Sequence, residues 1–190
     1  AFDSVDRKFI INVLRFFNFG KSIQKWIQIF FHDIESSVLV NGFASSFFKI
    51  SRGCRQGDPV SPYIFILCAE VLALLIKNNK NIKGIKIGSL ESLLAQFADD
   101  TTIILDGTEK SLYGAINTLN FFASFSGLKV NTEKTRLIWI GSKKRTRYKL
   151  CKEYNLDWSQ ENFKLLGIMF DVDQDSMRSE ERRVGKECRS

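Results

Sequence analysis

The chain has 190 residues, of which 44% are hydrophobic, so it can bury a sizeable core and global disorder is excluded. Its two prolines and twelve glycines exclude a collagen-like or linker protein. The formal net charge of +7 makes a polyanion a reasonable partner. The single histidine, His32, nearly excludes a histidine-rich metal site.

The cysteines and the apolar stretches indicate in which cellular compartment the protein is expected. The four cysteines lie too far apart for a zinc or redox motif, at Cys54, Cys68, Cys151 and Cys188. They indicate thiols in a reducing compartment, and no signal peptide opens the chain, so we expect an intracellular protein, nuclear or cytoplasmic, that is not secreted. The longest apolar stretch, residues 63–76, contains Glu70 and is shorter than the roughly 18 residues of a membrane span. We therefore expect a buried helix and no membrane.

Two helices are predicted at the start of the chain. Apolar residues recur at helical spacing over residues 6–19, with Asp6 as the N-cap. A second helical pattern covers residues 22–31, with Ser22 as its N-cap. The periodicity of this second pattern places Trp26 in the core.

A hairpin and a long helix are predicted next. Strand-like runs at residues 37–40 and 47–51 flank Asn41-Gly42, which is a strong turn signal. The pair Ser61-Pro62 predicts the start of a helix that runs to about Lys77, with the serine as N-cap.

The most distinctive stretch is residues 93–105, which follows a further predicted strand at residues 82–87. Two apolar, strand-like runs flank the pair Asp99-Asp100, which is expected at the turn between them. Adjacent carboxylates repel each other, and a bound magnesium ion would remove that repulsion. The alternative is an ordinary solvated turn, in which aspartate is common.

The rest of the chain predicts a helix over residues 108–126 that ends at Gly127, and then further strands. These strands are expected at residues 128–131, 137–140 and 163–170, with a basic cluster at residues 143–149. Hairpins interleaved with helices predict an α+β fold, in which helices pack on one face of an antiparallel sheet. We expect this domain to cover residues 1–170, and residues 171–190 to be a polar tail that is disordered or non-native.

Five motifs follow one another in a fixed order along residues 1–170. They are Ala1-Phe2-Asp3-Ser4-Val5, the stretch from Gly53 to Pro62, Phe97-Ala98-Asp99-Asp100, Gly127 to Asn131 with Glu133-Lys134-Thr135, and Leu165-Leu166-Gly167. The ordered set resembles the reverse transcriptase, an RNA-directed DNA polymerase, of non-LTR (LINE-type) retrotransposons. The acidic motif has Phe97 where many members have tyrosine. The resemblance implies a polymerase palm, with fingers and thumb largely absent.

The resemblance also implies catalytic roles. Asp99 and Asp100 would bind two magnesium ions, or manganese in their place, and Lys134 would donate a proton to the departing pyrophosphate. A lysine suits this role because its charge also screens phosphate. The alternative for Lys134 is a surface lysine.

Further residues would bind the substrates by the same resemblance. Phe2 would lie beside the incoming sugar and exclude a ribose 2′-hydroxyl, or else be a core aromatic. Gln56 and Gly57 would lie near the nucleotide and the template. Gly167 would let the primer backbone approach, or else mark a strand bulge. The basic cluster would contact template–primer phosphates, or else be a solvated loop, through Lys143, Lys144 and Arg145.

The third metal-binding aspartate of the family stands four residues before the alanine that is Ala1 here, and Asp3 and Asp6 do not replace it by position. We therefore expect a fragment of an enzyme that extends a DNA primer with dNTPs on an RNA template by two-metal phosphoryl transfer, inactive in isolation. The alternative is a non-catalytic nucleic-acid-binding remnant of a retroelement. A protein-interaction domain without nucleic acid is the least favoured reading.

Overall fold

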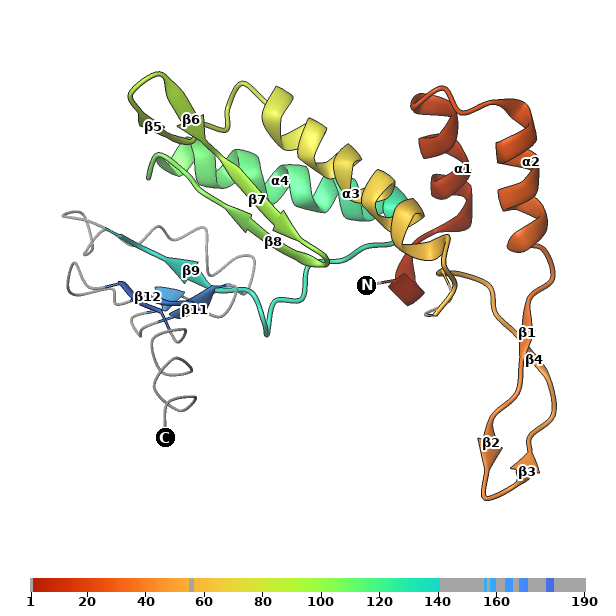
Figure 1. Cartoon of the computed structure of the whole chain (residues 1–190). Helices are drawn as coiled ribbons and strands as arrows, with labels where there is room; N and C mark the ends of the chain where they lie inside the picture. Colours follow the sequence, from red (N-terminus) through yellow and green to blue (C-terminus); the bar gives the residue numbers. More distant parts are fainter. Residues whose placement is uncertain are drawn as a thin grey trace, which may run out of the picture. The chain divides into compact units, whose positions relative to one another are not determined.

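The computed structural model of the chain describes residues 2–54, 57–140, 156, 158–159, 163–165, 168–170 and 177–179 (Figure 1). The chain divides into two compact units, residues 1–130 and residues 131–190. Four α-helices and a series of short strands give the described residues a mixed α+β architecture, which confirms the α+β part of the predicted fold class.

A helical hairpin opens the first unit. A short 3-10 helix, η1 (Phe2–Ser4), leads into α1 (Arg7–Phe16), and α2 (Lys21–Phe30) follows and packs beside α1 (Figure 1). α1 turns four apolar side chains into the core, whereas α2 buries only Ile27. The exposed fraction of Trp26 is 59%, so its predicted place in the core is wrong. α2 packs on α1, and several of its other apolar side chains are exposed.

Of the N-caps predicted for these two helices, one is confirmed and the other is wrong. Asp6 is the N-cap of α1, and its carboxylate accepts a hydrogen bond from the Phe9 N–H at 3.0 Å, as predicted. The prediction of Ser22 is wrong, because α2 begins at Lys21 and its N-cap is Gly20, which has no side chain to bond the helix.

An extended hairpin arm follows α2 and consists of β1 (Glu35–Ser36), β2 (Leu39–Val40), β3 (Phe43–Ala44) and β4 (Phe48–Lys49) (Figure 1). β2 pairs with β3, and β1 pairs with β4, both antiparallel. Asn41 and Gly42 form the two-residue loop with φ values of 50° and 84°, which confirms the predicted turn.

α3 (Ser61–Asn78) packs against α1 and α4. Its predicted N-cap is wrong: Val60 is the N-cap, and the Ser61 hydroxyl is buried without a hydrogen-bond partner in the described structure. The Val60 N–H instead donates to the Asp58 carboxylate at 3.0 Å, so that aspartate orders the turn that precedes the helix. By length and composition alone, α3 is long and apolar enough to cross a membrane. Core helices pass the same test, and the buried apolar residues of α3 belong to the core.

The core of the first unit lies where α1, α3 and α4 (Glu109–Ser126) meet. The rings of Phe9 and Phe122 pack edge to face, and their centroids are 5.7 Å apart. Both described cysteines are free and buried, in agreement with the predicted thiols. Burial raises the pKa of Cys54 to about 11 and that of Cys68 to about 12, so both thiols are protonated at neutral pH.

Two short hairpins connect α3 to α4. β5 (Ile85–Ile87) pairs with β6 (Leu90–Ser92), and β7 (Leu94–Phe97) pairs with β8 (Asp100–Ile103), both antiparallel. α3 and α4 lie along one side of the β7–β8 pair (Figure 1). The predicted single antiparallel sheet is not formed by the described strands, which make separate sheets of two or three strands.

The second unit begins with a turn rather than the strand predicted at residues 128–131. The Asn131 side-chain oxygen accepts hydrogen bonds from the N–H groups of Glu133 and Lys134 at 3.1 and 3.2 Å, an arrangement typical of an Asx-turn. The described strands of this unit are β9 (Leu137–Ile138), β10 (Trp158–Ser159), β11 (Phe163–Leu165), β12 (Ile168–Phe170) and β13 (Met177–Ser179).

β9 and β10 pair in parallel, and β11, β12 and β13 form an antiparallel sheet. The single strand predicted at residues 163–170 is therefore a hairpin of two strands. The predicted domain boundary at residue 170 stays a prediction.

A network of side chains holds the start of α4. The Asp106 carboxylate accepts hydrogen bonds from the N–H and the hydroxyl of Thr108 at 3.0 and 2.8 Å, and Thr108 is the N-cap of the helix. Burial raises the pKa of Asp106, but hydrogen bonds from Ser111 and Thr108 and the charge of Lys83 outweigh it, so this pKa is lowered overall.

We predict that Asp106→Asn lowers the free energy of unfolding by about 0.5–1 kcal/mol at pH 7. A carboxyl with a lowered pKa stabilises the fold above the unfolded-state pKa of about 3.9, and that contribution is lost as the pH falls through the folded-state value. Urea unfolding at pH 7 and below pH 4 checks this. A difference between wild type and variant that grows towards low pH would contradict it.

Candidate active site

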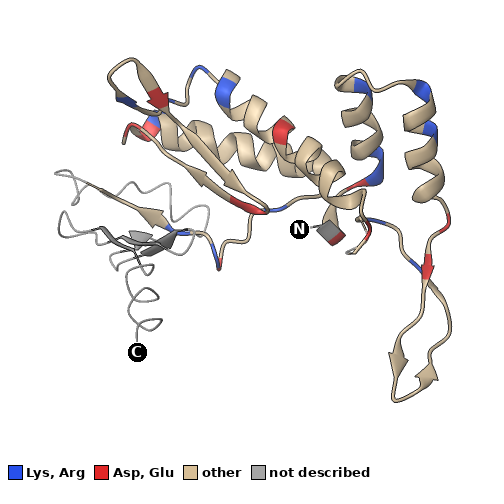
Figure 2. Cartoon of the chain, in the orientation of Figure 1, with Lys and Arg blue, Asp and Glu red and all other residues tan. Residues whose placement is uncertain are grey.

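The acidic pair lies at the tip of the β7–β8 hairpin, which we call the carboxylate hairpin. Phe97 pairs with Asp100, so the loop consists of Ala98 and Asp99 alone. The predicted turn is therefore confirmed in position, but only Asp99 lies in it, and Asp100 is the first residue of β8. Both aspartates are exposed, and they form the acidic tip of the hairpin in Figure 2.

The loop of the carboxylate hairpin has an unusual backbone. Ala98 has a φ of 51°, in the left-handed region that residues with a Cβ rarely adopt. Two-residue hairpin loops require such a φ at their first position, because it matches the twist of the paired strands. The tight loop thus holds the two carboxylates next to each other at the cost of strain at Ala98.

We predict that Ala98→Gly raises the free energy of unfolding by about 0.5–1 kcal/mol, because glycine adopts a positive φ without strain. Ala95→Gly is the matched control, since Ala95 lies in β7 of the same hairpin without a positive φ. That control is expected to lower the free energy of unfolding by a similar amount. Urea unfolding measures both, and a loss of stability in Ala98→Gly would contradict the assignment of strain.

The second motif packs on the residues that lead into α1, here called the N-terminal segment (residues 2–6). The N–H of Gly53 donates to the Val5 carbonyl at 2.9 Å. Gly53 has a φ of 83°, and a Cβ added there would lie 2.6 Å from the backbone of Asp3. Only glycine therefore allows this close approach.

The fourth motif packs on the same N-terminal segment through a second glycine. Gly127 ends α4 with a φ of 78°, as predicted, and a Cβ there would collide with the Ser4 carbonyl oxygen and lie 3.1 Å from the Asp6 nitrogen. The Asp6 N–H donates to the Ser126 carbonyl at 2.8 Å. Gly53 and Gly127 thus hold the N-terminal segment between two loops, which we call the glycine clamp.

The glycine clamp and the carboxylate hairpin lie at the same end of the first unit. In Figure 1 the tip of the hairpin and the N-terminal residues both lie towards the N-terminal end of α3, which starts at Ser61. The first three motifs and Gly127 are therefore gathered at one end of this unit, although more than a hundred residues separate them along the chain.

Gly57 differs from the clamp glycines. Its φ is 91°, but among the described residues no atom lies within 4 Å of an added Cβ. Position 57 therefore favours glycine because of its positive φ, and not because a described neighbour packs closely against it. The neighbouring Gln56 lies outside the described residues.

The chemistry of the acidic pair fits a hard divalent cation. Two exposed carboxylates at the tip of one hairpin are the kind of oxygen donor that magnesium prefers. Among the described residues no group of three histidine, cysteine, aspartate or glutamate side chains gathers to bind a metal. As a pair, Asp99 and Asp100 could supply only part of the ligands that a magnesium ion takes.

The other predicted site residues are placed less fully. Lys134 lies in the Asn131 turn of the second unit, whereas Asp99 and Asp100 belong to the first. Phe2 begins η1, and the structure describes its backbone only. The remaining residues of the predicted primer and template contacts lie outside the described residues, and they are Gly167, Lys143, Lys144 and Arg145. The roles of all these residues stay predictions.

The glycine clamp is the part of this site that the sequence did not reveal. The sequence predicts Gly127 as the end of a helix and the start of the fourth motif, and Gly53 as the start of the second motif, but no contact of either with residues 3–6. A glycine that follows a helix is the same local signal whether or not another segment packs against it. The close approach to residues 3–6 becomes visible only in the fold.

Comparison with known proteins agrees with this arrangement of motifs. Residues 1–170 match the family model described as "Reverse transcriptase (RNA-dependent DNA polymerase)". The chain is 31% identical over 140 residues to the Retrovirus-related Pol polyprotein from type-2 retrotransposable element R2DM of Drosophila melanogaster, a match that covers 74% of this chain and 13% of that protein.

Two further relatives differ in how much of each protein is matched. The Transposon TX1 uncharacterized 149 kDa protein of Xenopus laevis is 24% identical over 92% of this chain, which is 13% of that protein. An uncharacterized mitochondrial protein of Arabidopsis thaliana is 35% identical over 55% of this chain and 88% of its own length. The chain thus matches only 13% of the length of each of the two transposable-element proteins. The predicted resemblance is confirmed: the chain belongs to the reverse transcriptase (RNA-dependent DNA polymerase) family and is related to the Pol proteins of non-LTR retrotransposons of the R2 and TX1 type.

Proposed function

We propose that this chain is the palm region of an RNA-directed DNA polymerase that extends a DNA primer with dNTPs on an RNA template. The observation that carries the proposal is the carboxylate hairpin, which presents Asp99 in its exposed two-residue loop and the exposed Asp100 at the start of β8, in a chain of this family. Family membership supports nucleic acid as the substrate class and phosphoryl transfer as the chemistry.

Each predicted residue has a role in this proposal. Asp99 and Asp100 hold the divalent cations through their carboxylate oxygens. Magnesium, when bound, supplies the positive charge that stabilises the attacking and leaving oxygens. Lys134 gives a proton to the pyrophosphate. Gly57 has no Cβ, so the nucleotide can approach the backbone of its loop closely. The glycine clamp fixes the N-terminal segment, and with it the start of the first motif, beside the second and fourth motifs.

The remaining contacts extend the proposal to the substrates. Phe2 borders the sugar of the incoming nucleotide and Gln56 contacts the nucleotide or template. The primer and template backbones run along Gly167, Lys143, Lys144 and Arg145, whose positive charges suit phosphates.

Primer extension tests the proposal. A version of the protein extended at its N-terminus through the complete first motif is expected to add dNTPs to a DNA primer on an RNA template when magnesium is present. The same protein with Asp99→Ala and Asp100→Ala is expected not to do so. Equal extension by both proteins would show that the catalytic assignment is wrong.

A non-catalytic nucleic-acid-binding remnant is the second candidate. It is favoured by the formal net charge of +7, which suits a polyanion without requiring catalysis. This candidate predicts no extension by the longer protein but salt-dependent binding of primer–template, which survives the double substitution.

A further inference from the structure

The helical hairpin of α1 and α2 carries charge of one sign. From residue 7 to residue 32 the sequence contains five basic residues and no acidic one, and they are Arg7, Lys8, Arg15, Lys21 and Lys25. Figure 2 shows basic positions and no acidic position on either helix. The chain as a whole has 28 basic and 21 acidic residues, so 26 consecutive residues without a carboxylate are a local departure from its average.

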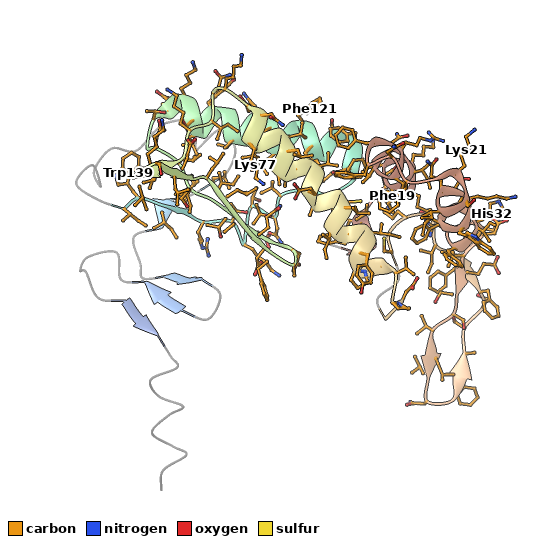
Figure 3. The ribbon with its side chains drawn as sticks, turned by 45° about the horizontal axis from the view of Figure 1, so that its top comes forward. Phe19, Lys21, His32, Lys77, Phe121 and Trp139 are labelled. Atoms are coloured by element: carbon orange, nitrogen blue, oxygen red, sulfur yellow. The ribbon has the colours of Figure 1, made fainter. Side chains whose placement is uncertain are left out.

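Aromatic rings lie exposed on the same helical hairpin. On α2 the exposed fractions of Trp26 and Phe30 are 59% and 52%, and their ring centroids are 6.2 Å apart with the planes tilted by 32°. Lys21 and Lys25 are exposed on this helix as well, and Figure 3 shows Lys21 pointing away from the helices. Lys21 and Lys25 lie one turn apart in one row along α2, and Trp26 and Phe30 lie one turn apart in a second row, so the exposed surface of the helix presents both charges and rings.

Fixed contacts hold the backbone of this surface. Ile27 packs into the core, and the Gln24 amide donates to the Phe19 carbonyl at 2.6 Å. At the other end of α2, the Arg7 guanidinium donates a hydrogen bond to the Phe31 carbonyl at 2.8 Å. The Cζ atom of Arg7 also lies over the Phe31 ring, 5.7 Å from the ring centroid. The exposed rings therefore stand on a helix whose two ends are tied to its surroundings.

We propose that the exposed face of α2 is a binding surface for single-stranded nucleic acid, separate from the carboxylate hairpin. Lys21 and Lys25 contact backbone phosphates. An unpaired base stacks on the ring of Trp26, and the exposed ring of Phe30 extends this apolar surface. A strand of this kind is the partner that combines dense negative charge with free aromatic faces. A duplex offers the charge without the free bases, and an apolar protein surface offers no charge to the lysines.

The apolar hairpin arm is a weaker candidate for the same role. Its exposed side chains include Leu39, Phe43 and Phe47, but between Val38 and Phe48 the sequence contains no basic residue. Charge complementarity therefore selects α2.

Fluorescence anisotropy with the 190-residue chain tests the proposal, with a labelled single-stranded RNA, a single-stranded DNA of the same sequence and a DNA duplex as probes. Trp26→Ala is expected to weaken binding of both single strands about 5- to 100-fold and binding of the duplex much less. Trp26→Phe, which keeps an aromatic ring, is expected to restore most of the affinity. The side chain is exposed, so circular dichroism is expected to show an unchanged helix content.

The lysines are tested by salt dependence. Lys21→Ala with Lys25→Ala is expected to lower the slope of log K against log salt by roughly 1.4 for a single strand. The matched control is Lys77→Ala with Lys80→Ala, which removes the same charge from the end of α3 and the residues after it. An equal loss in the control, or single-strand binding that Trp26→Ala leaves unchanged, would overturn the proposal.

The same assay separates this surface from the proposed polymerase site. Asp99→Asn with Asp100→Asn is expected to leave binding at α2 intact while it abolishes extension by the longer protein. An α2 surface that fails the binding test leaves the extension test unaffected, so the two failures are distinguishable.

Discussion

Gly127→Ala is expected to lower the free energy of unfolding by about 2–5 kcal/mol. Part of this loss, about 1–2 kcal/mol, is the strain of an alanine at a φ of 78°. The remainder comes from the collision of the new Cβ with the Ser4 carbonyl, which forces the N-terminal segment away from the end of α4. Gly53→Ala is expected to have a similar effect, since its Cβ would lie 2.6 Å from the backbone of Asp3.

Gly42→Ala is the matched control for both clamp substitutions. Gly42 has a φ of 84°, close to those of the clamp glycines, but no atom lies within 4 Å of an added Cβ. Its substitution is therefore expected to cost only the strain, about 1–2 kcal/mol. Urea unfolding of the three variants isolates the contribution of the close approach. Equal losses at Gly127, Gly53 and Gly42 would contradict the glycine clamp.

Asp100→Asn is expected to slow primer extension by the longer protein by about 10³-fold or more. The substitution keeps the size of the side chain and suits the start of a strand after a tight loop, so the hairpin is expected to persist. It removes the negative charge that draws a divalent cation, and charge stabilisation by that cation contributes several kcal/mol to phosphoryl transfer. Asp99→Asn is expected to act in the same direction.

The rate of single-nucleotide addition at saturating magnesium measures this effect. Asp106→Asn is the matched control, because it makes the same chemical change six residues further along the chain, at a carboxylate that accepts hydrogen bonds from Thr108, the N-cap of α4. Its rate is expected to stay within a few-fold of the wild-type rate. A loss of less than tenfold in Asp100→Asn, in a protein with an unchanged melting temperature, would contradict the metal-binding role.

Local signals in the sequence predicted the features that depend on neighbouring residues alone. Asp6 caps α1, Asn41-Gly42 forms a hairpin loop, and Gly127 ends α4, because each requires only a short side chain or a positive φ at one position. Ser22 and Ser61 carry the same type of signal and are not caps. α2 begins one residue before Ser22, and Ser61 is itself the first residue of α3, so neither serine stands at the N-cap position.

Features that depend on distant segments could not be predicted. The apolar periodicity of α2 is present in the helix, but periodicity does not say which apolar positions become buried, and Trp26 is exposed. Similarly, the strand predicted at residues 82–87 is a short hairpin strand that turns at Gly88, because its partner β6 follows at once.

The candidate site shows the same division between local and distant information. The sequence placed the acidic pair at a turn, but the register that leaves Asp99 in the loop and Asp100 in β8 is set by pairing of residues 94–97 with residues 100–103. The glycine clamp depends on contacts between residues separated by about 50 and 120 positions, which no local pattern encodes.

Paramagnetic broadening by manganese tests most directly whether the carboxylate hairpin binds the metal. With trace Mn²⁺ added to the isotope-labelled chain, the amide signals of residues 97–101 are expected to broaden first. Asp99→Asn with Asp100→Asn is expected to abolish that broadening, while the signals around Asp106 stay unchanged in both proteins. Broadening that is equally strong around Asp106, or that survives the double substitution, would contradict the assignment of Asp99 and Asp100 as the metal-binding pair.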